Sequence, residues 1–252
     1  MRTLTDCVLY DASALHDITH IIDIDGFYVN KHFYPKEICL LSVDNDDALR
    51  IDVRLPMSFN ELTHKQRSQV CYVTKFVHGL YWTNDIDTSG FKAERMLYDA
   101  KNVPTIIRAV LREYADHRRS FLEPDPQTLV AYKGGTVERN ILVAAGIPCI
   151  DLEVYGCPKF ETLIQHMSLP NSIARIFSNP QVRFECDNHG RRPEASPGSP
   201  EWWWANALEV GEDNLSQRRR HRVRIWHCPV EECRAFASWL RNVRQNTQHS
   251  KQ

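Results

Sequence analysis

The sequence lacks three features: a strong net charge, a long apolar run and an N-terminal secretion signal. Its 31 basic residues balance 32 acidic residues, so any nucleic-acid contact must use a local patch rather than the field of the whole molecule. No apolar run approaches the length of a membrane span, and acidic residues stand where a signal peptide requires an apolar segment. We therefore expect a cytoplasmic or nuclear protein with no membrane partner. Its eight cysteines are expected to be reduced.

The order of the apolar patterns predicts an α/β fold. Three runs joined by short polar links predict an antiparallel meander, after which strands and helices alternate. The expected strands are residues 19–25, 36–44, 48–55, 128–134 and 147–152. The expected helices are residues 58–77, a helix beginning at Pro104, and residues 136–146, 158–167 and 229–243. This order resembles the ribonuclease-H-like fold, a mixed sheet with helices on both faces.

One domain is expected over residues 19–245, preceded by an N-terminal extension, residues 1–18. Residues 190–224 combine Pro, Ser, Gly and charge without a sustained period, which indicates a long irregular insertion. The polar tail, residues 246–252, is expected to be disordered.

Two aspartates stand in the first predicted strand. Asp23 and Asp25 are two residues apart and therefore point to the same side of that strand. This is the geometry that two carboxylates need to share a divalent ion. A buried Asp23 also needs a partner, because an isolated charge is costly to bury.

The segments "DID", "YKGGTVERNIL" and "HCPVEECRAFASWL" resemble the three motifs of the DnaQ-like exonuclease branch of the ribonuclease-H-like superfamily. The resemblance implies a two-metal 3′–5′ exonuclease site in which acids bind Mg²⁺ or Mn²⁺ and a histidine acts as general base. The residues implied are Asp23, Asp25, Glu138, His227 and Glu232. Glutamate replaces the family's usual aspartate at positions 138 and 232. Both glutamates could instead be ordinary solvated helix residues.

A second group of residues combines sulfur, nitrogen and oxygen ligands, as tetrahedral zinc sites do. The segments "PKEI", "ECDNHG" and "WHCPVEEC" resemble the zinc-binding set of the Maelstrom domain, a ribonuclease-H-like domain of animal small-RNA transposon silencing. The chain is also similar to transposon-associated arthropod proteins with a Gly-Cys-Pro segment, here residues 156–158. The resemblance implies a structural Zn²⁺ bound by Glu37, Cys186, His189 and Cys228.

Two features depart from the Maelstrom pattern. About 38 residues separate His189 from Cys228, where the family has a short link, and the accompanying high-mobility-group box is missing. The alternative is that Cys186 and Cys228 are buried thiols and that His189 is a turn residue.

Five arginines gather shortly before the last predicted helix and could attract phosphates. They are Arg218, Arg219, Arg220, Arg222 and Arg224. The nearby tryptophans, residues 202–204, could stack on bases. A solvated face or a nuclear-localisation signal would explain the arginines equally well.

Three functions remain open. The sequence favours a non-catalytic, zinc-stabilised ribonuclease-H-like module that binds RNA or other single-stranded nucleic acid, or silencing-pathway proteins. The first alternative is an active nuclease that depends on Mg²⁺ or Mn²⁺. The second is a transposon-derived protein-interaction module with no nucleic-acid role.

Overall fold

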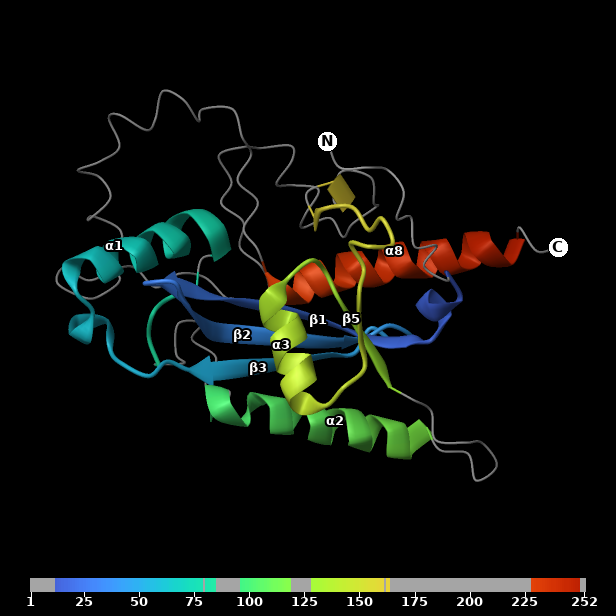
Figure 1. Ribbon diagram of the computed structural model, residues 1–252, viewed down its shortest axis with the longest axis horizontal. Helices are drawn as coiled ribbons and strands as arrows, with labels where there is room; N and C mark the ends of the chain where they lie inside the picture. Colours follow the sequence, from blue (N-terminus) through green and yellow to red (C-terminus); the bar gives the residue numbers. More distant parts are fainter. Residues whose placement is uncertain are drawn as a thin grey trace, which may run out of the picture.

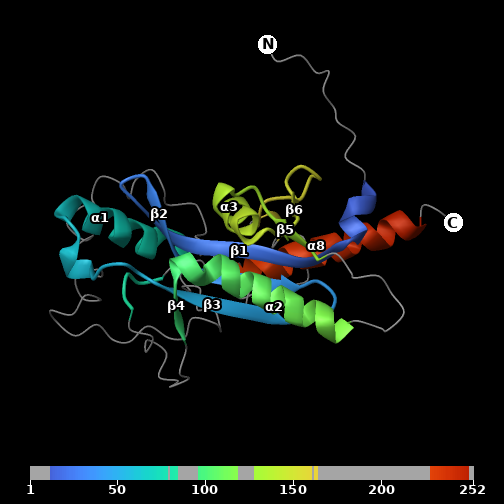
Figure 2. The ribbon, with the colours of Figure 1, turned by 60° about the horizontal axis from the view of Figure 1, so that its bottom comes forward.

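The computed structural model describes residues 12–78, 80–84, 96–118, 128–160, 162–163 and 228–249, and these ranges form an α/β fold. A mixed sheet of six strands, in the order β4-β3-β2-β1-β5-β6, carries helices on both faces (Figures 1 and 2). The strands are β1 (Ile18–Val29), β2 (His32–Ser42), β3 (Ala48–Arg54), β4 (Leu97–Asp99), β5 (Leu129–Tyr132) and β6 (Cys149–Asp151). The main helices are α1 (His64–Val73), α2 (Val103–Arg118), α3 (Thr136–Ala145) and α8 (Pro229–His249).

Shorter helical turns flank these elements. The 3-10 turns are η1 (Ala12–His16), η2 (Phe59–Glu61) and η4 (Ala100–Asn102), and a π turn, η3 (Thr74–His78), extends α1.

The predicted meander is confirmed. Strand β2 pairs antiparallel with both β1 and β3, while β5 runs parallel to β1 and β6 parallel to β5. The β1–β2 hairpin turns at Asn30 and Lys31, which both have positive φ, as tight hairpin turns require. Strand β1 therefore lies inside the sheet, between β2 and β5.

A bulge divides the β1–β2 hairpin into two halves. Asp25 pairs with Glu37, but the next residue, Gly26, pairs with Pro35, so Lys36 is an extra residue in β2. Side chains alternate along a strand, so all odd-numbered residues of β1 face the same side of the sheet. The residues of β2 that face this side are odd-numbered up to Glu37 and even-numbered beyond the bulge, from Tyr34 to His32. In the first half Ile21 packs beneath α8. In the second half Phe27 packs against the α1 block, defined as residues 55–82.

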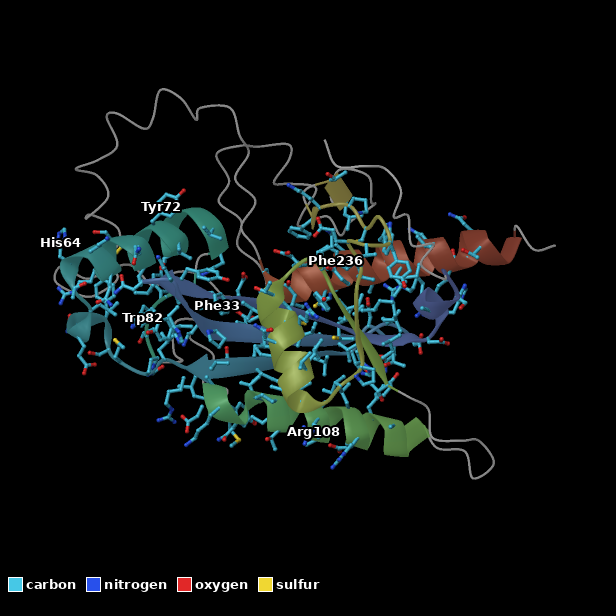
Figure 3. All side chains as sticks on the ribbon, in the orientation of Figure 1. Phe33, His64, Tyr72, Trp82, Arg108 and Phe236 are labelled. Atoms are coloured by element: carbon cyan, nitrogen blue, oxygen red, sulfur yellow. The ribbon has the colours of Figure 1, made fainter. Side chains whose placement is uncertain are left out.

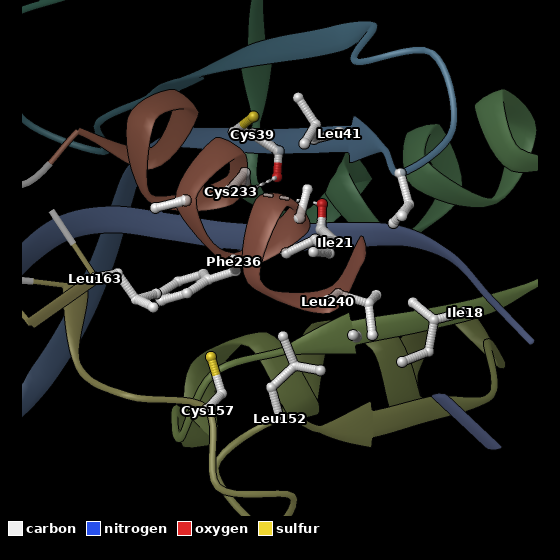
Figure 4. Close-up of a cluster of buried hydrophobic side chains, with 14 of the residues drawn as sticks. Ile18, Ile21, Cys39, Leu41, Leu152, Cys157, Leu163, Cys233, Phe236 and Leu240 are labelled. Carbon is white, nitrogen blue, oxygen red and sulfur yellow. Dashed lines mark hydrogen bonds between the residues drawn. The ribbon is translucent and has the colours of Figure 1, made fainter. Parts of the chain in front are cut away.

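Three apolar clusters follow from this arrangement. Beneath α8, Phe236 and Leu240 pack on Ile21 and Leu41 (Figure 4). On the opposite face, Ile107 and Leu111 of α2 cover even residues of β1 and β2 such as Ile22 and Leu40. The third cluster lies beneath α1, where Trp82 is fully buried against Phe27 and Tyr34 (Figure 3).

Several predicted boundaries were wrong. The capping box from Ser58 to Glu61 exists but closes only η2, because Leu62 is extended and buried in the α1 cluster. A second capping box, from Thr63 to Gln66, begins α1. Strand β4, next to β3 at the edge of the sheet, was not predicted.

The last helix is longer than predicted. Helix α8 continues to His249, so residues 246–249 are helical and not part of a disordered tail. Arg241 and Arg244 hold this end of the helix by donating to the carbonyl oxygens of Val43, Leu15 and Ile18.

Helix α3 begins and ends as predicted to within a residue, and Gly146 caps it in the left-handed conformation. The predicted helix 158–167 lies only partly within the described residues. The predicted insertion, residues 190–224, lies outside them.

Candidate acidic site

Strand β1 directs its two aspartates to the face of the sheet that α8 covers. Asp23 and Asp25 alternate with Ile24 and share the side of Ile21, which packs beneath α8. Their neighbours across the hairpin are Cys39 and Glu37. Both aspartates are half-buried and stand between the cluster beneath α8 and the cluster beneath α1.

Two glutamates reach the same place from helices that are far away in the sequence. Glu138 lies in the first turn of α3 and Glu232 in the first turn of α8, and each side chain is only 8% exposed. Figure 1 shows the first turns of these two helices next to each other, although α3 packs with α2 on one face of the sheet and α8 covers the other. The site therefore collects one acid from each of two helices and two acids from one strand.

The four carboxylates act on one another electrostatically. Burial raises the pKa of Asp23 well above its usual range, and the charges of Glu232, Asp25 and Glu138 raise that pKa further, in this order. Burial also raises the pKa of Glu138; its own backbone N–H opposes the rise, and the charge of Glu232 adds to it. The acidic site is defined here as Asp23, Asp25, Glu138 and Glu232.

The loop before α3 fits closely around Glu138. A Cβ atom on Gly135 would lie 1.6 Å from Oε2 of Glu138, so a larger residue here would push this carboxylate out of its present position. Because Glu138 stands in the first turn, the partial positive charge of the helix N-terminus also favours its carboxylate.

Two cysteines lie beside the acidic site. Cys233 of α8 is fully buried, and its thiol donates to the carbonyl oxygens of Ile21 and Cys39 (Figure 4). Burial raises the pKa of Cys233, a hydrogen bond with the Cys39 side chain raises it further, and so do the charges of Asp23 and Glu232. The Cys233 thiol therefore remains protonated, and both cysteines are fully buried as part of the core.

Sequence analysis missed two residues that matter here. Asp151, at the end of β6, accepts from the backbone N–H groups of Gly134 and Glu153, and its charge raises the pKa of Glu138. Arg50 of β3 forms an ion pair with Glu37, with 3.2 Å between Nε and Oε1. Strand pairing brings Asp151 near Glu138 and Arg50 next to Glu37 in the neighbouring strand, and neither residue stands in a local motif that would have revealed it.

The predicted zinc ligands are only partly described. Glu37 is 1% exposed and Cys228 is buried under the start of α8, so both belong to the α8 side of the sheet. Cys186, His189, His227 and the arginines at 218–224 lie outside the described residues.

Within the described ranges, no group of three or more His, Cys, Asp or Glu side chains is arranged to hold a metal ion. None of the helices in those ranges is long and apolar enough to cross a membrane.

Fold and site together define an α/β protein with a mixed sheet and a cluster of four carboxylates that one strand and two helices supply. The chain matches no family model, no curated protein and no solved structure.

Proposed function

We propose that this chain is a ribonuclease-H-like protein whose acidic site binds divalent cations and hydrolyses the backbone of single-stranded RNA or DNA. The observation that carries the proposal is the convergence of Asp23, Asp25, Glu138 and Glu232 from three elements. The fold supports it, because an antiparallel meander with its first strand inside the sheet is followed by parallel strand–helix units.

The charge of the acidic site favours a cation. Four buried or half-buried carboxylates repel one another, so the folded protein without a cation must hold protons there or lose stability. Carboxylate oxygens are the ligands that Mg²⁺ prefers, and a bound cation would remove this repulsion. When bound, such a cation would polarise a phosphate and lower the pKa of a water molecule.

The residues of the chain would divide the work. Asp23 and Asp25 come from a central strand and give a rigid base, whereas Glu138 and Glu232 have longer side chains that can adjust. Adjustment is necessary, because the described side chains do not form a finished metal site as they stand. Cys39 and Cys233, buried beside Asp23, exclude water from that side. The general-base role of His227 stays a prediction.

The test uses two neighbouring glutamates of α8. Glu232 belongs to the acidic site, whereas Glu231 forms an ion pair with Arg234, with 2.8 Å between the charged atoms. Purified protein would be incubated with end-labelled single-stranded RNA or DNA and Mn²⁺. We expect cleavage that is lost in Glu232→Gln and retained in Glu231→Gln. Absence of cleavage by the unmodified chain, or equal cleavage by both variants, would refute the proposal.

A second candidate function is a non-catalytic, zinc-stabilised module that binds RNA or silencing-pathway proteins in the cytoplasm or nucleus. The observation that favours it is the burial of Glu37 and Cys228 on the same side of the sheet. Metal analysis of the purified chain would test it. One zinc ion per chain that is lost in Cys228→Ser, while Cys157→Ser retains it, would support this function.

A further inference from the structure

His78 ends the π turn that extends α1, and it is buried although it is polar. Its ring packs edge-to-face on Phe27 at 5.0 Å between ring centroids. Nε2 lies 2.9 Å from the carbonyl oxygen of Gly26, and Nδ1 lies 3.0 Å from the backbone nitrogen of Leu80. A π turn is rare and often marks a functional segment, so the reason for this geometry bears on function.

The two partners fix the protonation of the ring. The backbone N–H of Leu80 can only donate, so Nδ1 accepts and carries no proton. The carbonyl oxygen of Gly26 can only accept, so Nε2 must carry the proton. His78 is therefore neutral and donates from Nε2 to the backbone of β1.

The carbonyl that His78 holds belongs to the residue after Asp25. Gly26 stands at the bulge, where a Cβ would lie 2.2 Å from the carbonyl oxygen of Tyr34, so the two strands meet here at unusually close range. A bulge interrupts the ladder and can re-aim an adjacent side chain, so the direction of Asp25 depends on the backbone at this point. The hydrogen bond from His78 supplies a constraint at this point, 52 residues away in sequence.

We propose that His78 is a positioning residue for Asp25. By donating to Gly26, it fixes the backbone at the bulge and with it the direction in which the Asp25 carboxylate enters the acidic site. The π turn then has a function, because its extra residue brings the His78 ring to this carbonyl. The proposed cation affinity of the acidic site depends on this contact, so the inference rests on the proposed function.

Two substitutions separate the two hydrogen bonds of the ring. His78→Gln places an amide N–H at about the reach of Nε2 and retains a donor for Gly26. His78→Asn places its amide oxygen at about the position of Nδ1 and retains only the acceptor for Leu80. Thr74→Val is the matched control: it removes the hydrogen bond from Thr74 to the Leu80 carbonyl, at the other end of the same π turn.

The first measurement is Mn²⁺ affinity, by calorimetric titration of the full chain. We expect a loss of roughly tenfold in His78→Asn, as for other residues that orient a metal ligand, and little change in His78→Gln and Thr74→Val. Equal losses in the Asn and Gln variants, or an equal loss in Thr74→Val, would overturn the inference and reduce His78 to a core residue.

The second measurement needs no metal and separates the inference from the proposed function. Carbon-detected NMR of the metal-free chain should show a displaced Asp25 Cγ resonance in His78→Asn but not in His78→Gln. If the unmodified chain binds no Mn²⁺, the proposed function fails, and this resonance alone decides whether His78 positions Asp25. Nitrogen NMR of the unmodified chain should also show the proton on Nε2; a proton on Nδ1 would refute the inference whether or not the variants fold.

Discussion

Replacement of Arg50 by methionine tests whether Glu37 is balanced by an arginine or by zinc. Glu37 is 1% exposed, and Arg50 is its ion-pair partner at 3.2 Å. Arg50→Met keeps an apolar chain of similar length but leaves the buried carboxylate without this positive charge. The expected result is a large loss of stability in the metal-free chain, because an unbalanced buried charge is costly.

The magnitude follows from the geometry. Two unit charges 3.2 Å apart attract by about 5 kcal/mol at the effective dielectric constant of about 20 that suits protein sites. The side chain of Arg50 is 18% exposed and also contacts Asp52 at 3.5 Å, so solvent and a second acid weaken the pairing with Glu37. We expect a loss of about 3 kcal/mol, near the lower end of measured values for broken buried pairs.

Urea unfolding of chelator-treated protein would measure this loss. The double variant Glu37→Gln with Arg50→Met is the control and should recover most of the stability, because it removes both charges. A single-variant loss below about 1 kcal/mol after chelation would refute the ion pair as the partner of Glu37. If the loss is small in zinc-loaded protein and becomes large on chelation, zinc carries the balancing charge.

Three further predictions follow. Asp23→Asn should stabilise the metal-free chain at neutral pH. Because the pKa of Asp23 is raised in the folded state, the parent chain is most stable at low pH and loses stability as Asp23 ionises at higher pH. The difference in urea midpoint between variant and parent should therefore grow from about pH 4 upward. Gly26→Ala should lower stability by roughly 2–3 kcal/mol in the same assay, because its Cβ would meet backbone atoms of Tyr34 and Pro35. Leu240→Ala should lower it by about 3 kcal/mol, because the cluster beneath α8 cannot close around the cavity; thermal unfolding would measure this.

The sequence predicted the parts of the fold that local patterns encode. Apolar runs predicted β1 and β2, alternation predicted β3, and Gly146 correctly ended α3. Strand β4 was missed because its three residues become a strand only by pairing with β3 across 45 positions, from Asp52 to Leu97. The extension of α8 was missed because its last turns look polar, although Arg241 and Arg244 bind carbonyl groups of other segments.

The candidate site was predictable to the same degree. Spacing pointed to Asp23 and Asp25, and resemblance added Glu138, His227 and Glu232. The charges of the four described acids act on one another, while their catalytic role stays a prediction. Arg50 and Asp151 could not be found, because each reaches its partner through strand pairing rather than through a local motif. The contact between His78 and Gly26 was invisible for the same reason: it joins a π turn to a bulge.

The extra residue in β2 has a consequence for how this chain can evolve or be engineered. Because Lys36 is an extra residue, odd-numbered residues of β2 such as Leu41 pack beneath α8, whereas the even-numbered Tyr34 packs beneath α1. One strand therefore contacts both helices on the same side of the hairpin. Deletion of this single residue would restore regular pairing and turn Tyr34 away from the cluster beneath α1. The count of residues between Tyr34 and Glu37 is therefore constrained as well as the residue type, because Lys36 itself donates from Nζ to the carbonyl oxygen of Thr83 at 2.6 Å.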